Sequence, residues 1–366
     1  KIEIITKSKT YPIYFGNKNL KIIGKLIKKN LNNTKKICII SDKKLPPKSL
    51  KILTKYLKNY NLKIYKFSAN EKLKSFKVAN KLIEDLLKFN LNRSDCVIAF
   101  GGGIISDLSA FVASLIKRGV NLINIPTSLL AQVDASIGGK TGVNSNKGKN
   151  LIGTFYQPNF VLIDTSLLNS LPARQMICGY GEILKHSLIL NRNFFLWLDK
   201  NAERILKNRD KKILKSAILQ SCKIKSKVIK MDEKENNLRM VLNFGHTFAH
   251  GFEGAKKFSN KLNHGEAVLL GMILASRFSY KKRMLSFKDL KLIEEHYIKL
   301  SLPNKIGNIF KKNDINKIIS FMKKDKKNLN NKINLVLLNK IGKVAKNKRY
   351  SITPNELKKF FLSNYT

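Results

Sequence analysis

A strand-like segment that runs directly into three glycines limits the fold of this chain more than any other feature. Asp95–Phe100 (DCVIAF) is followed at once by Gly101, Gly102 and Gly103, and then by the apolar helical pattern of Leu108–Lys117. Backbone N–H groups at such a turn can approach an anion closely, and the helix dipole favours negative charge there. The spacing is not G-x-G-x-x-G, so a phosphate site and a tight strand–helix turn are both open interpretations. Either one predicts an α/β unit.

The alternation of strand and helix patterns continues through the first half of the chain. It is typical of a mostly parallel sheet covered by helices, a Rossmann-like domain, which we expect to span residues 1–167. A helix is predicted at Phe76–Phe89. The predicted strands are Lys36–Ser41, Leu62–Phe67, Asp95–Phe100, Asn121–Ile125 and Val161–Asp164.

Long helical patterns replace the strand patterns in the second half. We therefore expect an α/β fold class whose C-terminal domain, residues 168–366, is all-helical. Only Asn334–Leu338 looks extended, and Lys323–Asn334 is expected to be a polar loop. The predicted helices are Tyr180–Leu190, Phe194–Leu206, Ile213–Met231, Leu242–Phe252, His264–Tyr280 and Asp289–Lys299.

The chain is strongly basic, with 71 Lys and Arg against 24 Asp and Glu and a formal net charge of +47. Such a charge makes nucleic-acid binding a rival hypothesis. However, 61 of these residues are Lys and ten are Arg, whereas base recognition favours the planar fork of Arg. Residues 101–190, where the unusual motifs lie, hold seven basic against four acidic residues. We therefore expect no specific nucleic-acid partner, and interpret the excess of lysine as AT-rich coding bias.

The cysteines and the apolar segments bear on the compartment. Cys38, Cys96, Cys178 and Cys222 are scattered and form no C-x-x-C motif, which favours a reducing environment. The first ten residues lack the apolar core of a signal peptide. No apolar run approaches the roughly 18 residues of a membrane span. The sequence thus predicts a cytoplasmic protein with no membrane partner.

Histidine is rare, which makes its clustering informative. His246 and His250 are four residues apart and share one helix face, and His264 follows within 19 residues of His246. Glu182 and His186 form a second pair with the same spacing. A catalytic zinc ion commonly takes three protein ligands. The clustering therefore indicates a metal site, but spacing alone leaves the two pairs in competition.

The fifth histidine, His296, falls in the charged amphipathic pattern EEHYIKL. Solvated faces of such helices usually carry their polar residues. We therefore expect His296 to lie at the surface.

A glycine-rich polar segment extends from Gln132 to Asn150, after a predicted buried strand. Loops at the carboxyl ends of parallel strands are where α/β proteins bind ligands. Lys140 and Lys149 could hold a phosphate or carboxylate there, although a solvated lysine is the simpler interpretation of either one alone. Asp42, at the end of an earlier strand, could accept hydrogen bonds from a ribose.

Taken together, these segments resemble the 3-dehydroquinate synthase family over roughly residues 60–345. The resemblance implies an N-terminal NAD-binding domain, a C-terminal domain that binds metal and substrate, and a homodimer. It also implies Zn²⁺ (or Co²⁺) as a second cofactor. The matching segments are GGGIISDLSAFVAS (101–114), RGVNLINIPTSLLAQVDASIGGKTGVN (118–144), GKNLIGTFYQP (148–158), GEILKHSLI (181–189), LRMVLNFGHTFAHGFE (238–253) and NHGEAVLLGM (263–272).

The resemblance also assigns residues to the metal and the substrate. It implies Glu182, His246 and His264 as metal ligands, which leaves His186 and His250 outside the ligand set. Arg118 would reach the site of a partner subunit, and one lysine at 326 or 327 would contact substrate. The other implied catalytic or substrate positions are Asp134, Lys140, Asn150, Lys185, Lys225, Glu235, Arg239, Asn243 and His250.

For NAD, the resemblance implies a set drawn entirely from the first half of the chain. Ser106 stands where the family usually has Gly, Ala69-Asn70 where it has Asp-Gly, and Ser128 where Thr is common; these departures bear on NAD affinity. The implied residues are Asp42, Glu71, Lys74, Gly102, Gly103, Ile104, Ile105, Ser106, Asp107, Thr127, Ser128, Lys140, Lys149, Leu167, Leu168, Asn169 and Ser170.

The activity that the resemblance implies is that of a carbon–oxygen lyase of aromatic amino acid biosynthesis. It would convert the phosphorylated sugar acid 3-deoxy-D-arabino-heptulosonate 7-phosphate to 3-dehydroquinate and phosphate. The implied course is transient oxidation by NAD, phosphate elimination, re-reduction and intramolecular aldol closure. Another sugar-phosphate cyclase or a polyol dehydrogenase is the nearest alternative. The segments VDASIGGKTGVN and GKNLIGTFYQP favour the synthase over the dehydrogenases.

Overall fold

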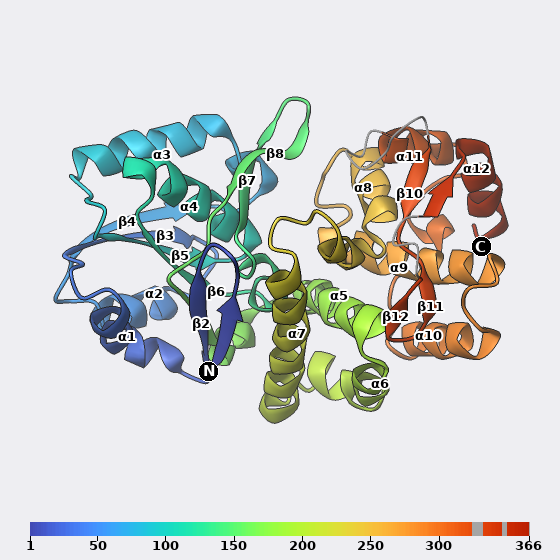
Figure 1. Cartoon of the computed structure of the whole chain (residues 1–366), viewed down its shortest axis with the longest axis horizontal. Helices are drawn as coiled ribbons and strands as arrows, with labels where there is room; N and C mark the ends of the chain where they lie inside the picture. Colours follow the sequence, from blue (N-terminus) through green and yellow to red (C-terminus); the bar gives the residue numbers. More distant parts are fainter. Residues whose placement is uncertain (324–331, 346–349, 366) are drawn as a thin grey trace. The chain divides into compact units, whose positions relative to one another are not determined.

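The computed structural model in Figure 1 describes residues 1–323, 332–345 and 350–365. It separates into two compact units. The first contains residues 1–172 together with 225–234, and the second contains residues 173–224 and the described residues from 235 onward. The candidate substrate lysines at 326 and 327, and most of the predicted loop Lys323–Asn334, lie outside the described residues.

The first unit is built on a seven-stranded sheet in the order β1-β2-β9-β6-β5-β3-β4. All neighbouring pairs are parallel except β1 and β2, which form an antiparallel hairpin at one edge. The five predicted strands are confirmed, and the edge hairpin was not predicted. The strands are β1 (Ile2–Ile5), β2 (Thr10–Gly16), β3 (Lys36–Asp42), β4 (Asn61–Phe67), β5 (Cys96–Gly101), β6 (Asn121–Pro126) and β9 (Phe160–Asp164).

Helices cover both faces of this sheet, as the alternation of side chains along β3 shows. Cys38 and Ile40 pack into an apolar cluster with α3 (Phe76–Lys88) and α4 (Gly103–Leu115). Ile37 and Ile39 pack on the opposite face. That second cluster includes side chains of α1 (Ile23–Asn30) and α2 (Pro47–Lys55). A strand buried on both faces must be apolar throughout, which explains why these strands could be predicted from continuous apolar runs.

The glycine turn between β5 and α4 is closely packed. A Cβ atom on Gly101 would lie 2.6 Å from the side chain of Ile105, on the first turn of α4. Gly102 is extended and precedes the first residue of α4. The turn therefore brings the start of a helix directly against the end of a central strand, as its sequence predicts.

The glycine-rich segment after β6 is a hairpin rather than the predicted loop. A π-helical turn at Ala131–Ala135 leads into β7 (Lys140–Ser145), which pairs with β8 (Gly148–Phe155) in antiparallel register. Gly142 lies opposite Gly153, and a Cβ on Gly153 would lie 2.1 Å from the carbonyl oxygen of Thr141. Its polar composition is typical of loops, but the close approach of two glycines allows the strands to pair. Figure 1 shows the hairpin extending away from the main sheet.

The second unit is mostly helical, not entirely so. Two short antiparallel pairs, β10 (Ile333–Leu335) with β13 (Tyr350–Ile352) and β11 (Leu338–Lys340) with β12 (Lys343–Val344), interrupt the helices. None of the described helices is both long and apolar enough to cross a membrane. The helices are α5 (Ala173–Leu190), α6 (Arg192–Leu206), α7 (Lys211–Met231), α8 (His246–Ala255), α9 (His264–Lys281), α10 (Phe287–Lys299), α11 (Asp314–Lys323) and α12 (Pro354–Ser363). The end of α7, from Lys225, groups with the first unit.

Candidate active site

The sheet order reverses its direction of winding at the carboxyl ends of β3 and β5. The chain continues from β3 to β4 on one side, whereas β5 lies on the other side of β3. In open parallel sheets, ligands bind where the direction of winding reverses in this way. Asp42 ends β3, and the glycine turn follows β5. The topology therefore brings two of the predicted NAD segments to one edge of the sheet.

Asp42 is held by its own turn. Its Oδ1 accepts hydrogen bonds from the backbone N–H of Lys44, at 3.0 Å, and of Ala69, at 3.4 Å. On the next strand but one, Ser128 follows the end of β6, and a Cβ on Gly102 would lie 3.3 Å from the Ser128 Oγ. A larger residue at position 102 would therefore crowd Ser128. Glycine avoids this contact and leaves the backbone at the turn accessible.

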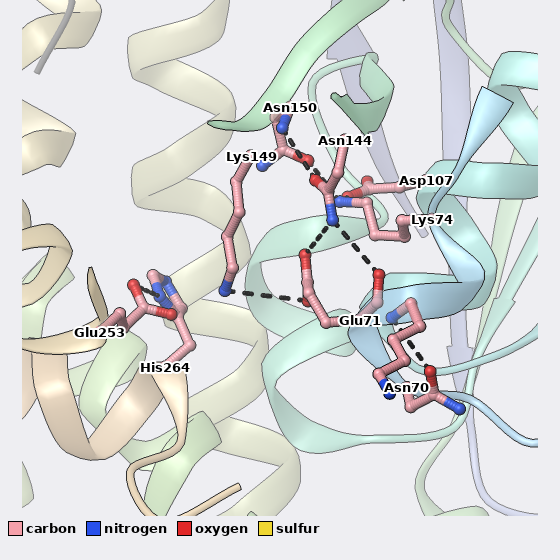
Figure 2. A network of polar contacts seen from close by, with 10 residues as sticks. Asn70, Glu71, Lys74, Asp107, Asn144, Lys149, Asn150, Glu253 and His264 are labelled. Carbon is pink, nitrogen blue, oxygen red and sulfur yellow. Dashed lines mark hydrogen bonds and ion pairs between the residues drawn. The ribbon is translucent and has the colours of Figure 1, made fainter. Parts of the chain in front are cut away.

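Two predicted NAD residues and one predicted substrate residue form a polar network around the buried Lys74, shown in Figure 2. Lys74 is only 4% exposed, and its Nζ lies 2.6 Å from Oδ2 of Asp107. The same ammonium donates to Oδ1 of Asn150. Burial raises the pKa of Asp107, and the Lys74 charge opposes that rise. The positive charge of Lys74 thus stabilises the ionised carboxylate of Asp107, which burial would otherwise disfavour.

A second part of this network surrounds Glu71. Its carboxylate forms an ion pair with Lys149, at 3.8 Å, and accepts a hydrogen bond from Nδ2 of Asn144, at 2.8 Å. Asn144 was not among the predicted site residues, although it ends one of the matching segments. Five predicted residues are thus brought together in the first unit: Glu71, Lys74, Asp107, Lys149 and Asn150.

Lys225 and Asp134, both predicted substrate residues, contact each other within the first unit. Nζ of Lys225 donates to the backbone oxygen of Asp134, at 2.6 Å, and to its Oδ1, at 2.5 Å. Lys225 is 4% exposed, so its ammonium is largely removed from solvent.

The remaining predicted residues of the first unit differ in exposure. Arg118 and Lys140 are exposed, as are Asn169 and Ser170 in the turn after β9. Five other predicted NAD positions have buried side chains. These buried positions are Ile105, Ser106, Thr127, Leu167 and Leu168.

In the second unit, three predicted metal ligands converge from three helices. Glu182 of α5, His246 at the start of α8 and His264 at the start of α9 each offer a ligand atom within 4.8 Å of the others. Nε2 of His246 lies 3.7 Å from Oε1 of Glu182. One carboxylate and two imidazoles form a donor set that a catalytic zinc ion takes in proteins.

Glu182 itself has the environment of a ligand. It is 1% exposed, and neither carboxylate oxygen accepts a hydrogen bond from the described residues, although Lys185 forms an ion pair with Oε2. A buried carboxylate without hydrogen-bond donors is unfavourable unless another positive charge completes its surroundings. The residues present therefore fit a divalent cation.

The opposite nitrogens of the two imidazoles are hydrogen bonded. Nδ1 of His264 lies 3.2 Å from Oε2 of Glu253, and Nδ1 of His246 lies 3.3 Å from the carbonyl oxygen of Phe244. Such contacts select the tautomer whose other nitrogen, Nε2, carries the lone pair. Glu253 was not predicted, yet it stands seven residues after His246, which places both on one face of α8.

The predicted substrate residues of the second unit lie beside these ligands or next to one another. Lys185 is one turn after Glu182 on α5, and the His250 and His246 rings are 6.0 Å apart. Glu235 accepts a hydrogen bond from Nδ2 of Asn243, at 2.8 Å. Arg239, on the turn that precedes α8, is 2% exposed.

Two further histidines are internal. Nδ1 of His186 lies 2.6 Å from Oγ of Ser221, deep in the second unit. His296 was predicted at the surface, and this is wrong: it is fully buried, with Nδ1 at 2.7 Å from Oδ1 of Asp199 and Nε2 at 2.8 Å from the hydroxyl of Tyr180. Its neighbours in sequence are charged, but its position falls on the buried face of α10. That face is formed by Leu290, Ile293, His296 and Tyr297.

Comparison with known proteins bears on both units. Two family models match consecutive parts of the chain: the 3-dehydroquinate synthase N-terminal model at residues 64–178 and the C-terminal model at residues 179–328. A curated 3-dehydroquinate synthase of Pelagibacter ubique (strain HTCC1062) is 50% identical over 342 residues, which cover 93% of each chain.

Solved structures have the same fold. A 2-deoxy-scyllo-inosose synthase complexed with carbaglucose-6-phosphate, NAD⁺ and Co²⁺ is 25% identical, with a TM-score of 0.85 over 99% of each chain. A 2-epi-5-epi-valiolone synthase from Streptomyces hygroscopicus with NAD⁺ and Zn²⁺ bound is 24% identical, with a TM-score of 0.86 over 98% of each chain. These likenesses confirm the predicted α/β fold class with a parallel-sheet domain, and the remainder is mostly helical where it was predicted to be all-helical. Because both family models match in order and half of all aligned residues are shared with a curated relative, the chain belongs to the 3-dehydroquinate synthase family.

Proposed function

We propose that this protein converts 3-deoxy-D-arabino-heptulosonate 7-phosphate to 3-dehydroquinate and phosphate, and so acts as a carbon–oxygen lyase of the shikimate pathway. The observation that carries the proposal is the convergence of Glu182, His246 and His264, with Lys185 on the buried carboxylate, in a chain of this family. Cytoplasmic location and a homodimer, in which Arg118 reaches the site of the partner subunit, are part of the same proposal.

NAD and a divalent metal, Zn²⁺ or Co²⁺, are the cofactors. The first solved structure above holds NAD⁺ and Co²⁺, and the second holds NAD⁺ and Zn²⁺. When bound, NAD supplies a hydride acceptor and donor, and the metal supplies a Lewis acid for a substrate oxygen. Glu182, His246 and His264 would hold the metal. Asp42, the glycine turn after β5 and the network around Glu71 and Lys74 would hold NAD in the domain of residues 1–167.

The protein's own residues bind and orient the substrate. Lys225 and Arg239 are both buried cations suited to a carboxylate and hydroxyl groups, and Asp134 fixes the ammonium of Lys225. Lys140, Asn150, Arg118 and His250 would bind the phosphate end. Orientation of this kind is expected to supply much of the rate enhancement, since the eliminated phosphate must align with the C–H bond that breaks beside it.

Another sugar-phosphate cyclase activity is the alternative candidate. The solved 2-deoxy-scyllo-inosose synthase covers the whole chain, so the fold alone accommodates other cyclic products. Sequence identity favours the heptulosonate substrate. The chain is 50% identical to the curated 3-dehydroquinate synthase and 25% identical to the inosose synthase. Specific nucleic-acid binding gains no support from the site, whose residues are those of a small-molecule enzyme.

The metal dependence tests this proposal. Purified protein dialysed against EDTA should lose its ability to release phosphate from the heptulosonate phosphate, and Zn²⁺ should restore it. His264→Ala and Glu182→Ala should not be restored at the same Zn²⁺ concentration. Full activity of either variant after dialysis would refute the assigned ligands.

A further inference from the structure

Asn144 occupies an irregular position in the β7–β8 hairpin. The pairing register shifts between Val143 and Ser145, so Asn144 does not pair with β8 in the regular way. Its backbone N–H instead donates to the carbonyl oxygen of Lys74, at 2.8 Å, and Asn144 forms an isolated parallel bridge with Ser75. Such bulges re-aim a side chain, and they are frequent beside active sites.

The re-aimed side chain contacts two groups that we assign to different ligands. Nδ2 of Asn144 donates to Oε1 of Glu71, at 2.8 Å, and to its backbone oxygen, at 3.2 Å. Oδ1 of Asn144 accepts from the backbone N–H of Asn150, at 2.9 Å. Figure 2 shows this amide between the carboxylate of Glu71 and the segment that carries Asn150. Three of the four hydrogen bonds available to an asparagine side chain are therefore used.

Both contacted groups need external support. Asn150 has a φ of 51°, in the left-handed region, which asparagine adopts more readily than most non-glycine residues but less often than the β or right-handed regions. The hydrogen bond that its N–H donates to Asn144 helps to hold this conformation. Glu71 is a partly exposed carboxylate, and its ion pair with Lys149 is long, at 3.8 Å. The side-chain amide of Asn144 hydrogen bonds to both, and so restricts the carboxylate of Glu71 and the backbone of Asn150 together.

We propose that Asn144 is a positioning residue that holds Glu71 in place for NAD and Asn150 in place for the phosphorylated substrate. This proposal rests on the proposed function, because that function assigns Glu71 to NAD and Asn150 to the substrate. It adds a residue to which neither the family resemblance nor the polar composition of the segment assigned a role. Asn144 acts through its two partners and touches no reacting atom in this account.

Two substitutions separate the contact of Asn144 with Glu71 from its contact with Asn150. Asn144→Asp keeps an acceptor for the Asn150 N–H, but it removes both hydrogen bonds to Glu71 and places two carboxylates side by side. Asn144→Ala removes the side-chain contacts with Glu71 and with Asn150. Asn146→Asp is the matched control, because it makes the same change of charge at an exposed position of the same hairpin turn.

The measurements are the Kd of NAD by calorimetry, and KM and kcat for the heptulosonate phosphate at saturating NAD and Zn²⁺. Asn144→Asp should raise the Kd of NAD about tenfold, the loss expected for one hydrogen bond to a charged group. Asn144→Ala should raise both that Kd and the substrate KM, while kcat changes much less. Asn146→Asp should match the unsubstituted protein in all three.

The outcomes separate this proposal from the proposed function. If the unsubstituted protein binds no NAD and releases no phosphate, the proposed function fails. If it does both and the Asn144 variants behave like Asn146→Asp, or lose kcat alone, the positioning role is overturned. Should Asn144→Ala not fold, the exchanged pair Asn144→Asp with Glu71→Gln decides. There a Gln amide can donate to the new carboxylate, so the Kd of NAD should return to that of Glu71→Gln alone; an unrestored Kd contradicts the proposal.

Discussion

Nδ1 of His264 lies 3.2 Å from Oε2 of Glu253, a carboxylate that is only 4% exposed. Glu253 lies on α8 and orients His264, a predicted metal ligand at the start of α9. Glu253 therefore links the packing of α8 to the geometry of the metal site. Carboxylate–histidine contacts of this kind fix the imidazole tautomer and increase its basicity as a ligand.

Glu253→Gln should weaken Zn²⁺ binding about 10- to 100-fold, because the imidazole loses its charged acceptor. Competition with a chromogenic chelator measures the affinity directly, without reference to turnover. Glu203→Gln, at an exposed carboxylate paired with Lys207 on α6, is the control and should bind Zn²⁺ normally. Equal affinity in the two variants would show that Glu253 does not support the ligand.

Lys74→Met should lower stability by about 1–3 kcal/mol, because it leaves the Asp107 carboxylate without its cation. Burial already raises the pKa of Asp107, and the loss of Lys74 should raise it further. A carboxyl with a raised folded-state pKa destabilises the fold above that pKa, and the penalty disappears as the pH falls and the group protonates.

The destabilisation by Lys74→Met should therefore be larger at pH 8 than at pH 5 in urea unfolding. Adding Asp107→Asn to Lys74→Met removes the uncompensated charge and should abolish that pH dependence. A destabilisation that is equal at both pH values would contradict the assigned ion pair.

Glu233 should make the fold sensitive to acid. Burial opposes its ionisation, but hydrogen bonds from Ser8 and Gln157 outweigh burial and lower the pKa of Glu233. A lowered folded-state pKa stabilises the fold above the unfolded value, about 4.3, and this stabilisation is lost as the pH falls through the folded value. Glu233→Gln should thus lower the melting temperature at pH 7, and the difference should shrink below about pH 4. A constant difference across this range would argue against the titration of Glu233.

His296→Leu should destabilise the protein by about 1–3 kcal/mol, because it leaves the buried hydroxyl of Tyr180 without its acceptor or donor. Lys288→Ala, at an exposed position on the same helix, should change stability by less than about 0.5 kcal/mol. Denaturant unfolding distinguishes the two. A neutral His296→Leu would mean that the contacts with Asp199 and Tyr180 contribute nothing.

The central strands could be predicted because burial on both faces leaves a continuous apolar run. The β1–β2 hairpin was missed since Pro12 interrupts its pattern. Proline is tolerated there because β2 pairs with β9 only from Ile13 onward, so Pro12 has β1 as its one neighbouring strand. The β7–β8 hairpin was missed because its residues are glycine and polar. Its position depends on tertiary contacts, such as that between Asn144 and the Lys74 carbonyl, which local patterns do not contain.

The candidate site could be predicted only in part, because it too depends on tertiary contacts that local patterns do not contain. Spacing alone could not choose between His246 with His250 and Glu182 with His186, since both pairs share a helix face. The packing of α5, α8 and α9 brings Glu182, His246 and His264 together, and only the resemblance anticipated that choice. The boundary at residue 167 and the individual NAD and substrate contacts remain predictions.

Phosphate release by the purified full chain tests the central claim most directly. With NAD and Zn²⁺ present, 3-deoxy-D-arabino-heptulosonate 7-phosphate should release one phosphate for each 3-dehydroquinate formed, with no net change in NADH absorbance. Sedoheptulose 7-phosphate and glucose 6-phosphate should yield no phosphate above background. Release from either of these sugars, with none from the heptulosonate phosphate, would contradict the account.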